Sequence, residues 1–214
     1  KNLYNVHVHY LLSELVINEK FMHIMLPIMF FDLNPENMEL SIEDIKDTKG
    51  DRIYDKISSL DNSVNQESKK YSIFIHENYF DMVNLFDYLK EEIKNIDLMS
   101  IKVLFFQLFI TLGKINENYS FFRHNKLDLK SIFIYKKKIN NESKILYKLR
   151  GKTFLVPNIG LNIKLTNFYD SVIGEFENKS IEKNKENPYY DIHYFISSFF
   201  IFIQNEKIKI DDEL

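Results

Sequence analysis

Apolar residues recur at helical spacing in four stretches of the chain. The clearest covers residues 98–116, where they repeat every three or four positions and therefore share one side of a helix. Further apolar residues widen this stripe, so we expect the helix to be buried on most sides. Narrower stripes predict helices over residues 4–17 and 81–94. A last helix is predicted over residues 189–204, after Pro188, because proline is favoured in the first turn.

Short stretches rich in β-branched and aromatic residues predict strands. They cover residues 71–76, 131–135, 145–149, 153–156 and 162–166. Gly151 and the Pro-Asn-Ile-Gly stretch at 157–160 separate the last three of them. Residues 21–33 predict a buried turn and strand, whereas residues 34–70 and 174–187 are polar and predict connections. This order of helices and strands predicts an α+β fold.

The composition excludes several classes of function. The 214 residues carry a net charge of −3, which gives no global attraction to nucleic acid or to a membrane. The longest apolar runs are too short to span a bilayer. The absence of cysteine excludes disulfides, thiolate metal sites and cysteine nucleophiles. Five of the six histidines are scattered without supporting carboxylates, so we predict no metal site.

The stretch that follows the long predicted helix carries the candidate chemistry. Residues 122–134 read FRHNKLDLKSIFI and resemble the catalytic loop of protein kinases, in which a histidine precedes the motif Asp-Leu-x-x-x-Asn. His124 and Leu127 keep the spacing of that motif. Lys126 stands at the position of the catalytic Asp, and Ser131 stands at the position of the metal-binding Asn.

Two later stretches resemble further kinase motifs. Residues 163–169 read IKLTNFY and are similar to the strand end that presents the metal-binding Asp. Phe168 is kept there, but Asn167 replaces the Asp. Residues 187–193 read NPYYDIH and resemble the start of the helix that anchors the C-lobe. The resemblance implies that Asp191 braces the backbone of the catalytic loop.

Several linked motifs resemble the kinase-like proteins of large nucleocytoplasmic DNA viruses in particular. These are RHN at 123–125, KTF at 152–154, PNIG at 157–160 and NPYYDIH at 187–193. The resemblance covers about residues 4–204. It implies a protein-kinase-like bilobal fold with a mostly helical C-lobe and a truncated N-lobe. We expect residues 1–75 to form what remains of the N-lobe and residues 76–214 the C-lobe, with the hinge near 76–80.

The replaced residues predict a loss of catalysis. Phosphoryl transfer needs a carboxylate to orient the attacking hydroxyl, and an Asp and an Asn to hold Mg²⁺. Lys126 carries an ammonium group, which has no acceptor for that proton. Asn167 offers a neutral carbonyl, a poorer Mg²⁺ ligand than a carboxylate, and Ser131 is shorter than Asn. No glycine precedes Gly50, so no glycine-rich phosphate loop stands ahead of the first predicted helix.

Some alternatives stay open at this point. His124 could be an ordinary core histidine. Asp128 could replace the missing base, and Asp170 could replace the missing metal ligand. Lys126 could pair with either of these or with a carboxylate of a partner. Glu14 is the residue that could match the helix Glu of an active kinase.

The resemblance therefore implies a catalytically inactive pseudokinase. We expect it to act as a protein-binding, scaffold or assembly component of a large DNA virus, in the host cytoplasm or in the virion. No cofactor is expected, and the partner is expected to be a viral protein. One alternative is an active or weakly active Ser/Thr kinase, for which ATP and Mg²⁺ would be the cofactors. The other is a structural subunit of a larger viral complex.

Overall fold

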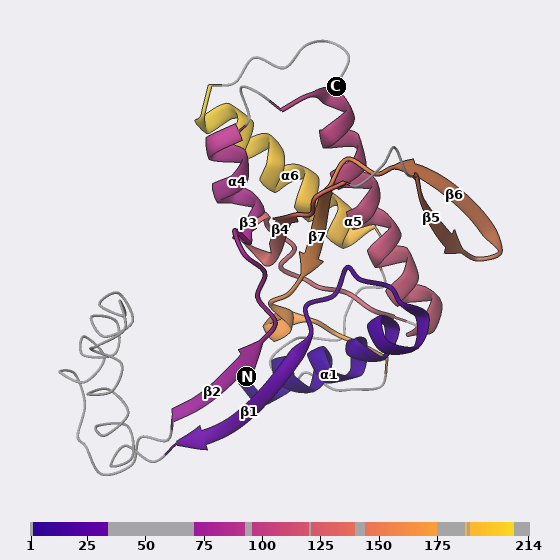
Figure 1. Ribbon diagram of the computed structural model, residues 1–214. Helices are drawn as coiled ribbons and strands as arrows, with labels where there is room; N and C mark the ends of the chain where they lie inside the picture. Colours follow the sequence, from indigo (N-terminus) through magenta and orange to yellow (C-terminus); the bar gives the residue numbers. More distant parts are fainter. Residues whose placement is uncertain are drawn as a thin grey trace. The chain divides into compact units, whose positions relative to one another are not determined.

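A computed structural model describes residues 2–33, 71–92, 96–119, 121–139, 144–174, 187 and 189–207 of the chain (Figure 1). The chain divides into two compact units. One consists of Lys1–Pro27 together with His76–Leu214, and the other of Ile28–Ile75. Both helices and small sheets are present, so the predicted α+β class is confirmed. The predicted lobe boundary near residue 75 stays a prediction, as do the connections predicted at 34–70 and 174–187, which lie almost wholly outside the described residues.

Four α-helices lie close to the predicted positions. They are α1 (Asn2–Glu19), α4 (Leu85–Glu92), α5 (Leu98–Asn118) and α6 (Tyr190–Asn205). α5 begins where Asp97 accepts a 2.7 Å hydrogen bond from the backbone N–H of Ser100, the N-cap arrangement that satisfies a free helix donor.

The helix predicted to begin at Asp81 begins four residues later. Residues Val83–Asn84 form the short strand β3, and the backbone N–H of Asp87 donates to the Asn84 side chain. The prediction was wrong at this end because β3 pairs with a distant strand, a contact that helical periodicity does not register.

A three-stranded antiparallel sheet lies in the larger unit. Its order is β3, then β4 (Ile132–Lys136), then β7 (Leu161–Leu165), with Ile134 opposite Ile163. All five residues of β7 are buried, which is typical of a strand covered on both faces. Two 3₁₀ turns, η2 (Leu129–Ser131) and η3 (Phe168–Asp170), adjoin β4 and β7.

A separate hairpin joins β5 (Lys144–Leu149) to β6 (Lys152–Pro157). Arg150 and Gly151 form its turn, and both have positive φ, at 47° and 73°. This is the conformation that a two-residue hairpin turn of type I′ requires. In the smaller unit, β1 (Pro27–Leu33) pairs with β2 (Tyr71–His76), and the hydroxyl of Ser72 donates to Asp32.

The core of the larger unit is organised around α5. Phe105 on this helix meets Phe195 and Phe199 of α6 edge to face, each with ring centroids 5.1 Å apart. Gln107 is buried and bonds to the backbone of β7 with both ends of its amide: Nε2 donates to Leu161, and Oε1 accepts from the N–H of Ile163. Within the described residues, α5 alone has the length and hydropathy of a membrane span, but about half of that stretch is buried in protein, so composition does not identify it as one.

Candidate functional site

Asp191 ties α6 to the loop that resembles a kinase catalytic loop. It lies in the first turn of α6 and is almost fully buried. Its two carboxylate oxygens accept from the backbone N–H groups of His124 and Asn125, at 2.7 and 2.8 Å. Burial raises the pKa of Asp191, and these two bonds oppose that shift. The geometry is that of a brace for the loop backbone.

His124 connects the same loop to the end of β7. Its Nε2 lies 2.8 Å from the carbonyl oxygen of Thr166, so this nitrogen carries the hydrogen. Nδ1 has no hydrogen-bond partner among the described residues. Burial lowers the pKa of His124, which keeps the ring neutral, and the ring packs 5.3 Å from that of Phe168. His124 therefore holds the loop beside Asn167 by packing and by one directed hydrogen bond.

The positions that would hold a metal in an active kinase contact each other. The Asn167 amide Nδ2 donates to the Ser131 hydroxyl at 3.1 Å. That hydroxyl lies 2.9 Å from Asp128 Oδ1 and 3.0 Å from the Lys126 carbonyl oxygen, and it can donate to one of them at a time. We call Lys126, Asp128, Ser131 and Asn167 the motif cluster. Asn167 lies 36 positions after Ser131 along the chain, and the fold brings it to the other three residues.

Asp128 is engaged in a capping role. Its Oδ1 accepts from the backbone N–H groups of Lys130 and Ser131, at 3.0 and 2.9 Å, so it caps η2. With the Ser131 hydroxyl, three donors converge on this one oxygen. Lys126, by contrast, is exposed and forms no ion pair with a described residue.

Asn167 has a left-handed backbone conformation, with φ 66° and ψ 55°. Asparagine tolerates this conformation better than most residues. The conformation turns the chain from β7 into η3, where Asp170 follows. The carbonyl oxygen of Asp170 accepts from the side-chain amide of Asn125 at 2.8 Å, which ties this turn back to the loop.

Helix α1 contributes two residues to the site that sequence reasoning missed. Asn5 Oδ1 accepts from the backbone N–H of Phe168 at 2.7 Å. His9 Nε2 lies 3.0 Å from the Thr166 hydroxyl, and its ring meets that of Phe168 edge to face at 4.6 Å. Burial lowers the pKa of His9 to about 4. The signal available in the sequence was a polar pair four residues apart, Asn5 and His9, among buried apolar neighbours on one helix.

Glu14, the other candidate on α1, lies elsewhere. It is exposed and accepts from the hydroxyl of Tyr119 at 3.2 Å. No described lysine forms an ion pair with it. The helix residue that reaches the Phe168 backbone is therefore the neutral Asn5.

Lys164 of β7 forms a buried ion pair with Glu77. Lys164 Nζ is 2.6 Å from Glu77 Oε1 and 3.2 Å from the carbonyl oxygen of Ile24, and only 1% of its side chain is exposed. Glu77 also accepts from the N–H of Leu26 and from the hydroxyl of Tyr79. Burial lowers the pKa of Lys164. This network joins the segment predicted as a hinge to β7.

Carboxylates and histidines do not gather into a metal-binding group of three anywhere in the described parts of the chain. In the motif cluster, Asp128 is the only carboxylate. Mg²⁺ prefers several oxygen ligands in octahedral geometry, including carboxylates and phosphates. The cluster as it stands offers one carboxylate, one hydroxyl and one amide, and these groups bond mainly to each other.

Comparison with known proteins identifies relatives among giant-virus proteins. No protein-family model matches the chain. Over 204 residues it is 30% identical to a protein of Acanthamoeba polyphaga mimivirus named "Putative serine/threonine-protein kinase R400". The predicted kinase-like resemblance is confirmed. A second mimivirus relative, "Uncharacterized protein R402", is 29% identical over 175 residues.

The two alignments differ in how much of each protein they cover. The first covers 88% of this chain and 43% of its relative, and the second covers 81% of this chain and 18% of its relative. The chain therefore spans less than half the length of either protein. The kinase-like relationship extends over most of the described residues, including the motif cluster.

Proposed function

We propose that this chain is the kinase-like part of a catalytically inactive pseudokinase. Its three central catalytic positions hold Lys126, Ser131 and Asn167 in place of the usual Asp, Asn and Asp. The single observation that carries the proposal is the hydrogen-bond chain from Asn167 through Ser131 to Asp128. Polar groups that would face a metal ion are bonded to one another.

The electrostatic balance of the motif cluster supports the same conclusion. An active kinase gathers carboxylates that attract Mg²⁺ and accept a proton from the substrate hydroxyl. Here one carboxylate, on Asp128, stands with the ammonium of Lys126 two positions earlier. Because Asp128 Oδ1 already accepts from two backbone N–H groups and lies within hydrogen-bonding distance of the Ser131 hydroxyl, withdrawing it for base catalysis would cost the cap of η2.

The contacts that do not depend on catalysis are intact. Asp191 braces the loop, His124 joins it to Thr166, and Phe168 is packed by α1. Such a pattern favours a retained shape with a binding, scaffold or assembly role. The proposal includes a bilobal arrangement, with residues 1–75 in the N-lobe, a viral protein as partner, and location in the host cytoplasm or the virion.

Thermal unfolding with nucleotide tests the proposal. A ligand that binds the folded state raises the unfolding temperature, by an amount that grows with the logarithm of the ratio of its concentration to its Kd. We expect ATP with Mg²⁺ to give no larger increase than ATP with EDTA. A Mg²⁺-dependent increase of several degrees would contradict the proposal, because it requires a metal bridge between the protein and the phosphates.

The second candidate function is an atypical kinase that uses Asp128 as its base, since this carboxylate lies within the motif cluster. A phosphotransfer assay on the parent chain and on Asp128→Ala separates the two. We expect no transfer by either. Transfer by the parent that is lost in Asp128→Ala, but kept in the matched surface variant Asp87→Ala, would establish the kinase reading.

A further inference from the structure

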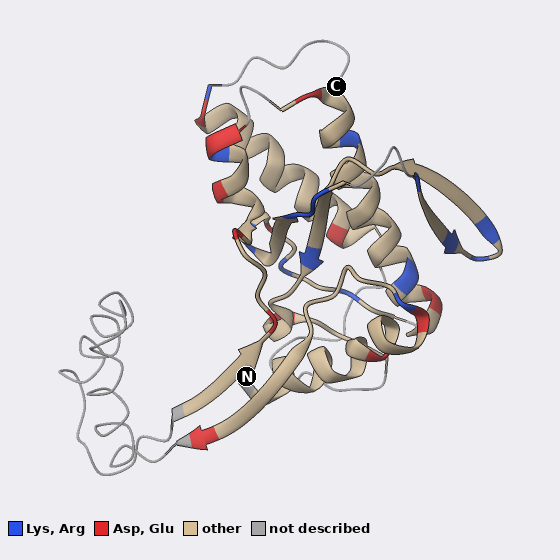
Figure 2. Cartoon of the chain, in the orientation of Figure 1, with Lys and Arg blue, Asp and Glu red and all other residues tan. Residues whose placement is uncertain are grey.

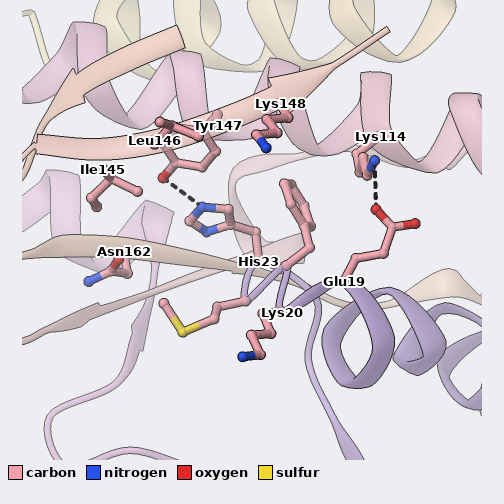
Figure 3. A pocket seen from close by; sticks show the side chains of 11 residues that line it. Glu19, Lys20, His23, Lys114, Ile145, Leu146, Tyr147, Lys148 and Asn162 are labelled. Atoms are coloured by element: carbon pink, nitrogen blue, oxygen red, sulfur yellow. Dashed lines mark hydrogen bonds and ion pairs between the residues drawn. The ribbon is translucent and has the colours of Figure 1, made fainter. Parts of the chain in front are cut away.

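A second site lies at the edge of the β5–β6 hairpin, in the larger unit. A cavity of about 420 Å³ opens between β5, the segment that follows α1, Lys114 of α5 and Asn162 of β7 (Figure 3). Its volume is in the range of ligand pockets in proteins. None of the motif cluster residues lines it.

The floor of this cavity is fixed by buried, bonded groups. His23 is buried, with Nε2 2.9 Å from the Tyr147 hydroxyl and Nδ1 3.1 Å from the carbonyl oxygen of Ile163 (Figure 3). Burial lowers the pKa of His23 to about 4, so the ring is neutral. The floor therefore brings no charge to a ligand and has little freedom to rearrange.

The walls carry an excess of positive charge. Lys114 forms ion pairs with Glu19 and Glu117, at 2.6 and 2.7 Å, so these three side chains together carry a charge of −1, which Lys20 and Lys148 exceed. Lys20 and Lys148 come from opposite walls, are exposed, and form no ion pair with any described residue (Figure 3). The hairpin itself has four basic residues and no acidic one (Figure 2). The charge of this site is complementary to an anionic ligand.

The cavity runs along the outer edge of β5. Its lining includes four consecutive residues of this strand, 145–148, and none of β6. Side chains of a strand alternate between its faces, so a cavity lined by four in a row follows the strand edge. β5 pairs with β6 alone, and its residues make no other backbone hydrogen bond within the described chain.

The register of the hairpin identifies the groups on that edge. Leu149 and Lys152 flank the two-residue turn, so they form a hydrogen-bonded pair. Alternation then directs the backbone N–H and C=O groups of Leu146 and Lys148 away from β6. Pro157, which has no N–H, lies opposite Lys144 at a position of the same outward type, as this assignment requires.

Two apolar side chains that line the cavity are exposed. Leu146 is 52% exposed and Met22 45%. Both line the cavity. They provide a surface that an apolar side chain of a ligand can cover.

We propose that an extended acidic segment of a partner protein binds here by adding a strand to the outer edge of β5. Its backbone pairs with Leu146 and Lys148, an apolar side chain covers Leu146 and Met22, and flanking carboxylates pair with Lys20 and Lys148. A small anion would use the two lysines and leave the strand edge unpaired. The inference adds a partner class to the binding role proposed above, at a surface apart from the motif cluster.

Peptide binding measured by fluorescence anisotropy tests this inference. The probe is the fluorescein-labelled octapeptide Glu-Thr-Val-Thr-Glu-Thr-Val-Thr, which places its glutamates and valines on one face of a strand, as Leu146 and Lys148 are on β5. It is titrated in low salt without nucleotide. We expect saturable binding that is weakened about tenfold by the double variant Lys20→Glu/Lys148→Glu. The matched control Lys152→Glu changes a lysine of the same hairpin outside the cavity, and it should leave the affinity unchanged.

Three peptide and protein controls can overturn the inference. A peptide with proline in place of valine lacks N–H groups for strand pairing and should bind at least about tenfold more weakly. Equal binding of that peptide, equal weakening by Lys152→Glu, or no saturation at millimolar peptide would each refute it. A stable dimer in light scattering that Lys148→Glu dissociates would assign the edge to a second copy instead. None of these outcomes bears on catalysis, which the nucleotide experiments decide separately.

Discussion

The motif cluster and the outer edge of β5 differ in how far their polar groups are hydrogen-bonded within the described chain. In the motif cluster, the side chains of Asn167, Ser131 and Asp128 are bonded in series. At the β5 edge, two backbone positions and two lysines have no partner among the described residues. Buried polar groups that bond to each other stabilise a shape, whereas exposed unpaired ones are free to bind another molecule. The two regions therefore differ in whether their polar groups are already satisfied within the described chain.

The largest expected effect is on the buried ion pair between Lys164 and Glu77. Lys164→Ala leaves the carboxylate of Glu77 without its cation, in a position where both are well shielded from water. Breaking such a buried pair typically costs about 4 kcal/mol in the free energy of unfolding. Urea denaturation would measure it. The double variant Lys164→Met/Glu77→Gln removes both charges and should recover much of the loss; no recovery would mean that packing, not charge, accounts for it.

The second largest effect is expected on acidification, which should lower the free energy of unfolding. The pKa of His9 and that of His23 are both lowered to about 4 from an ordinary 6.5. The unfolded chain therefore binds protons first as the pH falls. The free energy of unfolding is expected to decrease by up to about 3 kcal/mol per histidine between pH 6.5 and pH 4, and to be insensitive to these groups above pH 6.5.

Urea midpoints measured across that pH range would check the effect of acidification. His9→Gln should remove part of the slope. The exposed His193→Gln is the matched control and should leave the slope unchanged. A slope that persists in full in His9→Gln would show that His9 is not buried in its neutral form.

Removing the cap in the motif cluster should have a smaller effect. Asp128→Ala deprives two backbone N–H groups and one hydroxyl of their acceptor, and a lost cap costs about 1 kcal/mol. Asp128→Asn keeps an oxygen at Oδ1 and should cost less. Chemical denaturation of both variants would compare them, and equal losses would argue that the negative charge, not the cap, is what matters.

The smallest expected effect is at the β5 edge. Lys148→Ala removes an exposed side chain that has no ion pair within the described residues, so the free energy of unfolding should change by less than about 0.5 kcal/mol. The same substitution should weaken peptide binding. A variant that destabilised the chain by more than this would show that Lys148 is already engaged, and would weaken the contrast between the two regions.

Local pattern predicted the long elements well. Helices α1, α5 and α6 begin and end within a few residues of the ranges that apolar periodicity predicted. The start of α4 was predicted too early because Val83 pairs with Ile134, about 50 residues away, and periodicity carries no information on such pairs.

The sequence predicted which residues of the site follow one another at motif spacing, but not which distant segments pack against them. Motif spacing indicated His124, Ser131 and Asn167, and the structure brings these residues close together. The contributions of Asn5 and His9 depend on how α1 packs against η3, a contact between residues about 160 positions apart. The β5 edge was likewise beyond sequence reasoning, because the sequence does not show that β5 pairs with β6 alone among the described strands.

Gln107 has a consequence for the solubility of the chain. On the side opposite β4, β7 pairs with no other described strand, and the amide of Gln107 bonds to the backbone of Leu161 and Ile163 there. Residues His23 and Met25 bond to Leu165 on that side. A strand whose backbone edge is unpaired can pair with copies of itself and so form fibrils. Gln107, together with the backbone of His23 and Met25, thus protects this side of β7 from pairing with another chain.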